Sequence, residues 1–257
     1  SDRYLPLASF LRENGYAVYA NDCLGHGKSF SGEQNKGYFA PKNGWRALVD
    51  DMELLRKIAA DENSSLPIFY FGHSMGSFLV RTYIFTYPNA LNGAILSGTA
   101  HNAKPVAALG KTIAKIEKLF CGGHYRSKLI DNLCFGPYRK PFKPNKTPFD
   151  WLSRDEAVVK KYCDDDLCGF IFTLSAYIDL FDGLSQIAST KNIKRGNLSL
   201  PVLFISGTSD PVGNMTKGVN KVIEMFKNAG YTDITQKFYP DAHHEILNDF
   251  CAKEVQK

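Results

Sequence analysis

The sequence predicts an α/β fold, a doubly wound and mostly parallel sheet with an inserted, mainly helical segment. Short apolar runs alternate with long amphipathic stretches, the runs lack the strict alternation of half-exposed strands, and the rhythm breaks between residues 98 and 200. Buried parallel strands connected by helices produce this pattern. The 257 residues are 44% hydrophobic and 22% charged, as in globular proteins. Disorder, collagen and coiled coil are thereby disfavoured, and no apolar stretch reaches the ~18 residues of a membrane span.

Five runs rich in β-branched and aromatic residues are the expected strands. They cover residues 16–20, 67–72, 93–97, 201–207 and 233–239. Amphipathic helices are expected between them. Residues 45–58 place apolar side chains at three- and four-residue steps, and residues 217–229 repeat this pattern before Gly230, a residue typical of helix ends.

The long interval between the third and fourth expected strands predicts a separate subdomain, because structureless loops of that length are rare in compact domains. We expect a core of residues 1–99 and 197–257, and an inserted lid of residues 100–196 over the strand ends. Within this lid, residues 101–146 contain ten Lys and Arg against two acidic residues, a balance of +8. The whole chain carries +5, so the remainder carries −3. The lid therefore presents a positive face, which suits anionic partners or is simply solvated.

A nucleophile is predicted where the second expected strand ends. Residues 72–76 read Gly-His-Ser-Met-Gly, and a helix-like stretch follows. This is G-x-S-x-G between a strand and a helix, where a tight turn raises the serine oxygen at the carboxyl edge of the sheet. The tightness of the turn explains glycine at both Gly72 and Gly76. We expect Ser74 to be the nucleophile.

A serine nucleophile needs a base and an orienting acid, which follow it along the chain in this kind of fold. Asp210 lies just after the strand of residues 201–207, and His243 and His244 lie after the strand of residues 233–239. Three loops at one sheet edge thus supply the three residue types in order. The residues alone leave either histidine as the base. A metal site at residues 243–245 is disfavoured because the H-E-x-x-H spacing is missing.

Other classes of function have little support in the sequence. There is no P-loop or dinucleotide fingerprint, so no cofactor is implied, and no metal is expected. Aromatic residues in the basic segment could stack on bases, but a chain so near neutrality argues against nucleic-acid binding. The six cysteines form no C-x-x-C pair, which favours reduced thiols, and the charged residues 1–14 contain no signal-peptide pattern. A cytoplasmic location is expected.

Four motifs carry a resemblance to a known family. They are residues 15–29 (GYAVYANDCLGHGKS), 72–76 (GHSMG), 207–213 (GTSDPVG) and 239–248 (YPDAHHEILN). Over essentially its whole length, the chain resembles the α/β-hydrolase branch of monoacylglycerol lipases and bacterial lysophospholipase-like hydrolases, the serine aminopeptidase S33-like group. The resemblance implies Ser74 as nucleophile, Asp210 as acid and His244 as base. It also implies that the Met75 backbone N–H is one oxyanion-hole donor.

In the family, a His-Gly turn follows an early strand, precedes the first helix and supplies the second oxyanion donor. This sequence opens at what looks like the entry to that first helix, at residues 1–4, so this turn is not part of it. We expect that donor and the first strands of the sheet to lie upstream of Ser1, in a missing N-terminal segment. The expected function is that of a serine carboxylic-ester hydrolase acting on single-chain lipid esters, monoacylglycerol or lysophospholipid. The alternatives are a peptidase or amidase of the same fold, and a receptor-like homologue with slow turnover. The basic lid suggests transient contact with a membrane surface or with anionic head groups. The oligomeric state is not predicted.

Overall fold

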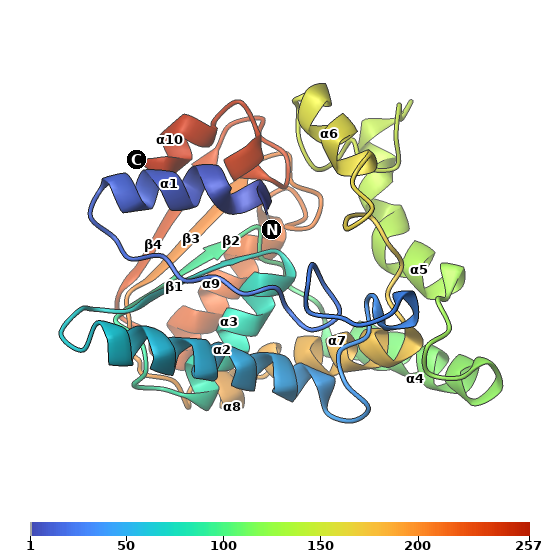
Figure 1. Ribbon diagram of the computed structural model, residues 1–257, viewed down its shortest axis with the longest axis horizontal. Coiled ribbons are helices and arrows are strands. Elements are labelled where there is room, and N and C mark those ends of the chain that lie inside the picture. Colours follow the sequence, from blue (N-terminus) through green and yellow to red (C-terminus); the bar gives the residue numbers. More distant parts are fainter. Residues whose placement is uncertain (1) are drawn as a thin grey trace.

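The computed structural model describes residues 2–257, and its centre is a four-stranded parallel sheet (Figure 1). The strands are β1 (Phe69–His73), β2 (Gly93–Ser97), β3 (Val202–Gly207) and β4 (Ile234–Tyr239), in the order β1-β2-β3-β4. Every neighbouring pair is parallel. All four strands therefore end at the same edge of the sheet, and four of the five predicted strands are confirmed.

The remaining strand prediction, for residues 16–20, is wrong. These residues are not part of the sheet, and residues 17–20 make no backbone–backbone hydrogen bond within the described part of the chain. A strand exists only where its N–H and C=O groups meet a partner strand. The side of β1 away from β2 pairs with no other described strand, and residues 16–20 and β1 instead line the same cavity.

Alternate side chains of the strands pack against helices on the two faces of the sheet, as the pleat requires. Leu96 and Phe204 enter the main core, to which α3 (Met75–Thr86) and α9 (Lys217–Ala229) contribute. Ile95 and Ile205 point to a second cluster on the other face, where α1 (Leu5–Glu13) and α10 (Ala252–Gln256) lie (Figure 1). Helices cover both faces, which confirms the doubly wound α/β fold.

Both predicted core helices form. Helix α2 (Gly44–Glu62) buries Trp45, Leu48 and Val49, and α9 ends at Gly230, whose φ of 104° favours glycine. The predicted apolar stripe of α2 is buried only in its first half. Leu55 and Ala59 of the second half line the cavity, whereas Ile58 does not line it and is 51% exposed.

The remaining helices belong mainly to the region predicted as a lid. They are α4 (Lys104–Cys121), α5 (Lys128–Arg139), α6 (Glu156–Cys163), α7 (Leu174–Ile187) and α8 (Thr190–Ile193), with short 3-10 turns at Asp2–Tyr4, Glu33–Asn35, Lys140–Phe142 and Ile246–Asn248. Helices α4, α5 and α6 stand beside the carboxyl edge of the sheet (Figure 1). Helix α7 instead places Leu174, Ala176 and Tyr177 in the main core and carries α4 on its surface. Among residues 2–257, no helix is both long and apolar enough to cross a membrane.

Candidate active site

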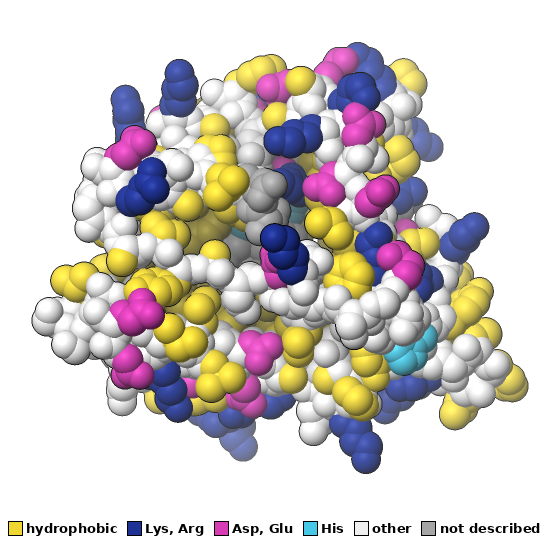
Figure 2. All heavy atoms as spheres, viewed as in Figure 1, with side chains coloured by type: hydrophobic (Ala, Val, Ile, Leu, Met, Phe, Trp, Pro, Cys, Tyr) yellow, Lys and Arg dark blue, Asp and Glu magenta, His cyan; other side chains and the backbone are white. Residues whose placement is uncertain are grey.

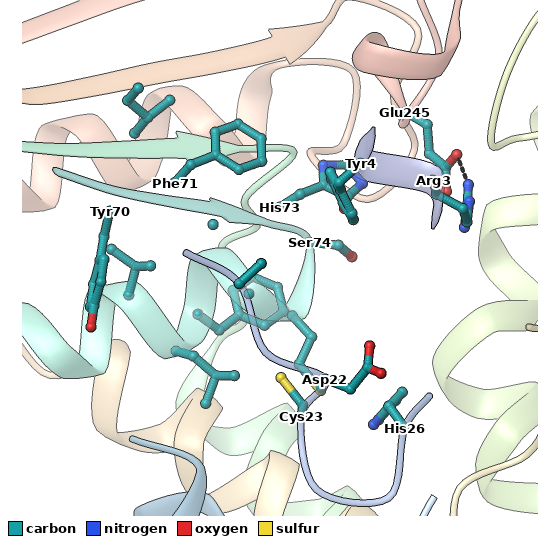
Figure 3. Close-up of a pocket in the computed structure, with 18 of the residues that line it drawn as sticks. Arg3, Tyr4, Asp22, Cys23, His26, Tyr70, Phe71, His73, Ser74 and Glu245 are labelled. Atoms are coloured by element: carbon teal, nitrogen blue, oxygen red, sulfur yellow. Dashed lines mark hydrogen bonds and ion pairs between the residues drawn. The ribbon is translucent and has the colours of Figure 1, made fainter. Parts of the chain in front are cut away.

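Ser74 lies in a strained turn between β1 and α3. Its φ of 54° and ψ of −121° are unusual for a residue with a side chain, and such strain is concentrated at functional sites. The turn is held by the Ser74 N–H, which donates to the Ser97 carbonyl at 2.9 Å, and by the Ser74 carbonyl, which accepts from the Ser77 hydroxyl at 2.6 Å. Figure 3 shows the Ser74 hydroxyl directed away from β1 into a cavity.

The two glycines that flank this turn differ in their need to be glycine. A Cβ on Gly72 would lie 2.4 Å from the Gly76 carbonyl oxygen, so no side chain fits there. A Cβ on Gly76 would meet nothing within 4 Å. The steric prediction is therefore confirmed at Gly72 and wrong at Gly76, because the helix turns its Cα away from the neighbouring elements.

Asp210 and His244 form a buried pair at the same edge of the sheet. The Nδ1 atom of His244 lies 2.9 Å from Asp210 Oδ2, and the two residues are 1% and 0% exposed. The other carboxylate oxygen of Asp210 accepts the Val212 backbone N–H at 2.8 Å. These contacts fix the carboxylate and leave Nε2 as the free ring nitrogen of His244.

Two close backbone approaches bring the loops of Asp210 and His244 together. A Cβ on Gly207, at the end of β3, would lie 2.0 Å from the Ala242 carbonyl oxygen, so the histidine loop packs directly on this glycine. A Cβ on Gly98, just after β2, would lie 2.8 Å from His244 Cε1. Glycine at both positions lets the imidazole sit against the strand ends.

The two adjacent histidines, which the sequence alone could not distinguish as candidate bases, have different surroundings in the structure. His243 points toward the lid, where its Nδ1 lies 3.0 Å from the Asp150 carbonyl oxygen and its ring lies 4.5 Å from that of Phe142. Only His244 contacts Asp210. The geometry thus agrees with the histidine that the family resemblance implies.

The Nε2 atom of His244 is buried and has no hydrogen-bond partner among the described residues. A second histidine packs beside it, because the ring of His73 lies 4.6 Å from that of His244. His73 Nδ1 is 3.1 Å from the Ser97 hydroxyl, and burial holds the pKa of His73 well below its usual value. His73 is therefore neutral at physiological pH and adds no second positive charge against His244.

An ion pair joins the N-terminal helix to the histidine loop. Glu245, the residue after His244, binds the Arg3 guanidinium (Figure 3). The same guanidinium lies 4.7 Å from the ring centre of Tyr162 in α6. The first helix, the histidine loop and the lid thus meet at one point. His73 and Glu245 were not predicted as site residues from the sequence, although each directly adjoins a predicted site residue.

Two of the three predicted residues, Ser74 and His244, border a large, mostly apolar cavity of about 1930 Å³. On the face shown in Figure 2, hydrophobic side chains gather around a hollow. Ser74, Met75 and His244 line it, together with residues of α4, α7 and β1 and with residues 16–20. Met75 is the first residue of α3, so its N–H has no partner within the helix and can bind an anion.

The cavity is suited to acyl transfer. The serine is held on a strained turn, a buried imidazole is oriented by a carboxylate, and an amide N–H lies at a helix start. These are the parts of a serine-hydrolase site. Within residues 2–257, no three His, Cys, Asp or Glu side chains gather as a set of metal ligands.

Comparison with known protein families agrees with this geometry. The family model described as serine aminopeptidase, S33, matches residues 1–250. The chain belongs to this family. Among curated relatives, a monoacylglycerol lipase of Mycolicibacterium smegmatis is 28% identical over 96% of this chain and 78% of its own length. The human monoglyceride lipase is 25% identical over 96% of this chain and 72% of its own length.

Two solved structures superpose on the whole chain. A thermostable carboxyl esterase from Bacillus coagulans has a TM-score of 0.91 and 31% identity, covering 100% of this chain and 83% of its own. A monoacylglycerol lipase from Paleococcus ferrophilus has a TM-score of 0.75 and 25% identity, covering 100% of this chain and 86% of its own. The α/β-hydrolase fold and the family resemblance are confirmed, and the S33 protein is a hydrolase of the carboxylesterase type.

Proposed function

We propose that this S33 hydrolase cleaves single-chain lipid esters, a monoacylglycerol or a lysophospholipid, through an acyl-enzyme on Ser74. The observation that carries the proposal is the buried pair of Asp210 and His244, at the sheet edge where Ser74 stands on its strained turn. The apolar cavity beside Ser74 supports an acyl chain as the part of the substrate that it holds.

In the proposed mechanism, the Ser74 oxygen attacks the ester carbonyl while His244 Nε2 takes the serine proton. Asp210 holds the imidazole in the tautomer with the proton on Nδ1 and stabilises the imidazolium. The Met75 N–H donates to the oxyanion, a contribution of about 3 kcal/mol for one donor. The imidazolium then protonates the leaving alcohol, and the same steps with water release the fatty acid.

The lipid-ester substrate distinguishes this proposal from a peptidase or amidase of the same fold. The relatives named as monoacylglycerol lipases span nearly the whole chain, and the cavity is lined mainly by hydrophobic side chains. A panel of monoacylglycerols, lysophospholipids and aminoacyl amides tests the choice. We expect hydrolysis of at least one lipid ester and none of the amides. Turnover of a short nitrophenyl ester would also separate an enzyme from a slow receptor-like homologue.

The lid has features of a surface that contacts lipid. Apolar side chains recur on α4 at three- and four-residue steps, at Val106, Leu109, Ile113, Ile116 and Phe120. The first three line the cavity, whereas Leu119 and Phe120 at the far end of α4 are 83% and 85% exposed. Exposed apolar stripes flanked by cations bind anionic membrane interfaces. We include transient contact between α4 and an anionic membrane surface in the proposed function.

Replacing Leu119 and Phe120 with serine is expected to weaken sedimentation with vesicles containing phosphatidylglycerol about tenfold, because two apolar side chains no longer enter the interface. Neither residue lines the cavity, so hydrolysis of a soluble short-chain ester is expected to be unchanged. The matched control is serine at Leu54 and Ile58, which are 58% and 51% exposed on α2. Equal losses in both variants, or in neither, would contradict the contact.

The positive charge of the lid predicts that binding to an anionic membrane surface depends on salt concentration. Lys104, Lys115 and Lys128 are exposed on α4 and α5, where Figure 2 shows basic and hydrophobic side chains close together. Attraction between these lysines and anionic lipids is screened within about 8 Å at physiological ionic strength. Vesicle binding is therefore expected to fall as salt rises, while hydrolysis of a soluble neutral ester stays constant.

We also keep a cytoplasmic location as a proposal. Its support is that all six cysteines are free thiols in the structure, which suits a reducing compartment. Fractionation of the source cells with an antibody against the protein tests it.

A further inference from the structure

Trp151 is held against the catalytic edge by the backbone of the lid. Its carbonyl accepts the His244 N–H at 3.3 Å, and the next carbonyl, of Leu152, accepts the Glu245 N–H at 2.8 Å. Its ring lies 5.3 Å from that of His244 and 5.3 Å from that of Tyr138. Trp151 is only 7% exposed and lines the cavity next to His244. The indole is therefore a fixed wall of the candidate active site.

The indole N–H of Trp151 has no hydrogen-bond partner among residues 2–257, although the nitrogen is buried. The other tryptophan of the chain, Trp45, is also buried, but its Nε1 donates to the Thr82 hydroxyl at 3.0 Å. Buried donors in proteins are nearly always satisfied, and an unsatisfied one costs stability. The second unpartnered nitrogen at this place is His244 Nε2, the atom that handles the proton in the proposed mechanism.

We propose that the Trp151 N–H binds a free hydroxyl group of the leaving alcohol, and that Trp151 thereby selects polyol esters. This inference rests on the proposed function and deepens it by favouring the glyceryl ester. The cavity is mostly apolar, and the indole of Trp151 on its wall carries a donor that has no acceptor among residues 2–257. Because the rings of Trp151 and His244 lie 5.3 Å apart, an alcohol whose leaving oxygen lies at His244 Nε2 would have the indole beside it.

The proposal assigns Trp151 to binding and not to proton transfer. No bond is made or broken at the indole, whose N–H stays neutral and donates to a hydroxyl oxygen. A site built to hydrogen-bond a substrate hydroxyl discriminates against an analogue that lacks it, because the buried donor is then left unpaired. A monoacylglycerol has such hydroxyls, whereas the methyl ester of the same fatty acid has none.

The test is Trp151→Phe, which removes the N–H and keeps an aromatic ring, with Trp45→Phe as the matched control. We expect Trp151→Phe to lower kcat/KM for a monoacylglycerol about tenfold and to change kcat/KM for the corresponding methyl ester less than twofold. Trp45→Phe is expected to leave the ratio of the two values unchanged. Equal loss for both esters in Trp151→Phe, or an unchanged ratio, overturns the inference. Failure of the wild-type protein to cleave a monoacylglycerol, a lysophospholipid or the methyl ester would instead overturn the proposed function. Cleavage of the lysophospholipid without the monoacylglycerol would overturn only this inference.

A second measurement does not depend on the folding of the Trp151 variant. The sequence has two tryptophans, so Trp45→Phe leaves Trp151 as the only one. With Ser74→Ala added, a non-hydrolysable 1-O-alkylglycerol is expected to shift the Trp151 fluorescence to longer wavelength, because its hydroxyl binds the indole N–H. The alkyl methyl ether of the same length is the control. If calorimetry shows that both ethers bind and the Trp151 emission is the same with each, the inference is overturned.

Discussion

Replacing Ser74 with alanine is expected to abolish covalent labelling by a fluorophosphonate and to lower ester hydrolysis at least about 10⁴-fold. Loss of the nucleophile removes the whole acyl-enzyme route, and only binding and oxyanion stabilisation remain. The fold is expected to survive, because alanine removes only the hydroxyl and both backbone contacts of Ser74 persist. The measurements are gel fluorescence after labelling, hydrolysis of a nitrophenyl ester, and thermal unfolding.

Two neighbouring serines provide the controls for this experiment. The Ser77 hydroxyl donates to the Ser74 carbonyl, and the Ser97 hydroxyl lies beside His73. Ser77→Ala and Ser97→Ala remove one buried contact each, for which we expect a loss of about 1 kcal/mol in stability. Both variants should still be labelled. Labelling of the Ser74→Ala protein would show that another serine is the nucleophile.

Replacing His244 with alanine is expected to cost about as much activity as the loss of Ser74, because members of a triad act as a unit. The structural reason is its contact with Asp210 at 2.9 Å, which no other histidine makes. His243→Ala is the matched control one residue away. It removes contacts with the Asp150 carbonyl and the Phe142 ring, so it should retain at least about a tenth of the activity.

Kinetics with a soluble ester and thermal unfolding distinguish the outcomes for these two histidines. Stable folding of both variants with activity lost only in His244→Ala supports His244 as the base. If His243→Ala loses the activity and His244→Ala keeps it, the base is one residue earlier. The geometry around Asp210 would then be structural and not catalytic.

Local patterns predicted the elements that local physics determines. The strands at residues 69–73 and 93–97 are apolar runs that pair with each other in parallel. Residues 93–97 are almost fully buried, as expected for a strand inside a parallel sheet, whereas residues 69–73 are only partly buried. The position of Ser74 also followed from the sequence, since a strand, a G-x-S-x-G turn and a helix occupy one short stretch. Gly72 was predicted correctly because the turn itself brings the Gly76 carbonyl against it.

Predictions failed where the outcome depends on a distant partner. Residues 16–20 have the composition of a strand, but no described strand pairs with them. The apolar stripe of α2 is not covered in its second half, where Leu55 lines the cavity and Ile58 is exposed. Trp151 could not be placed beside His244 from the sequence, because no spacing rule links a lid segment to the end of the last strand.

The sequence by itself determined the alternation of strands and helices, the turn that carries Ser74, and the chain order of the serine, acid and histidine. The strands, helices and turn depend mainly on residues close in the chain, and the order of the three residues is read directly from the sequence. Only the tertiary structure distinguished His244 from its neighbour, through Asp210, 34 positions earlier, and brought Trp151 beside the same imidazole. Adjacent residues in a loop have nearly the same sequence around them, so the sequence does not show which side chain faces the site. Contacts between distant loops decide this, and these loops pack closely at Gly98 and Gly207.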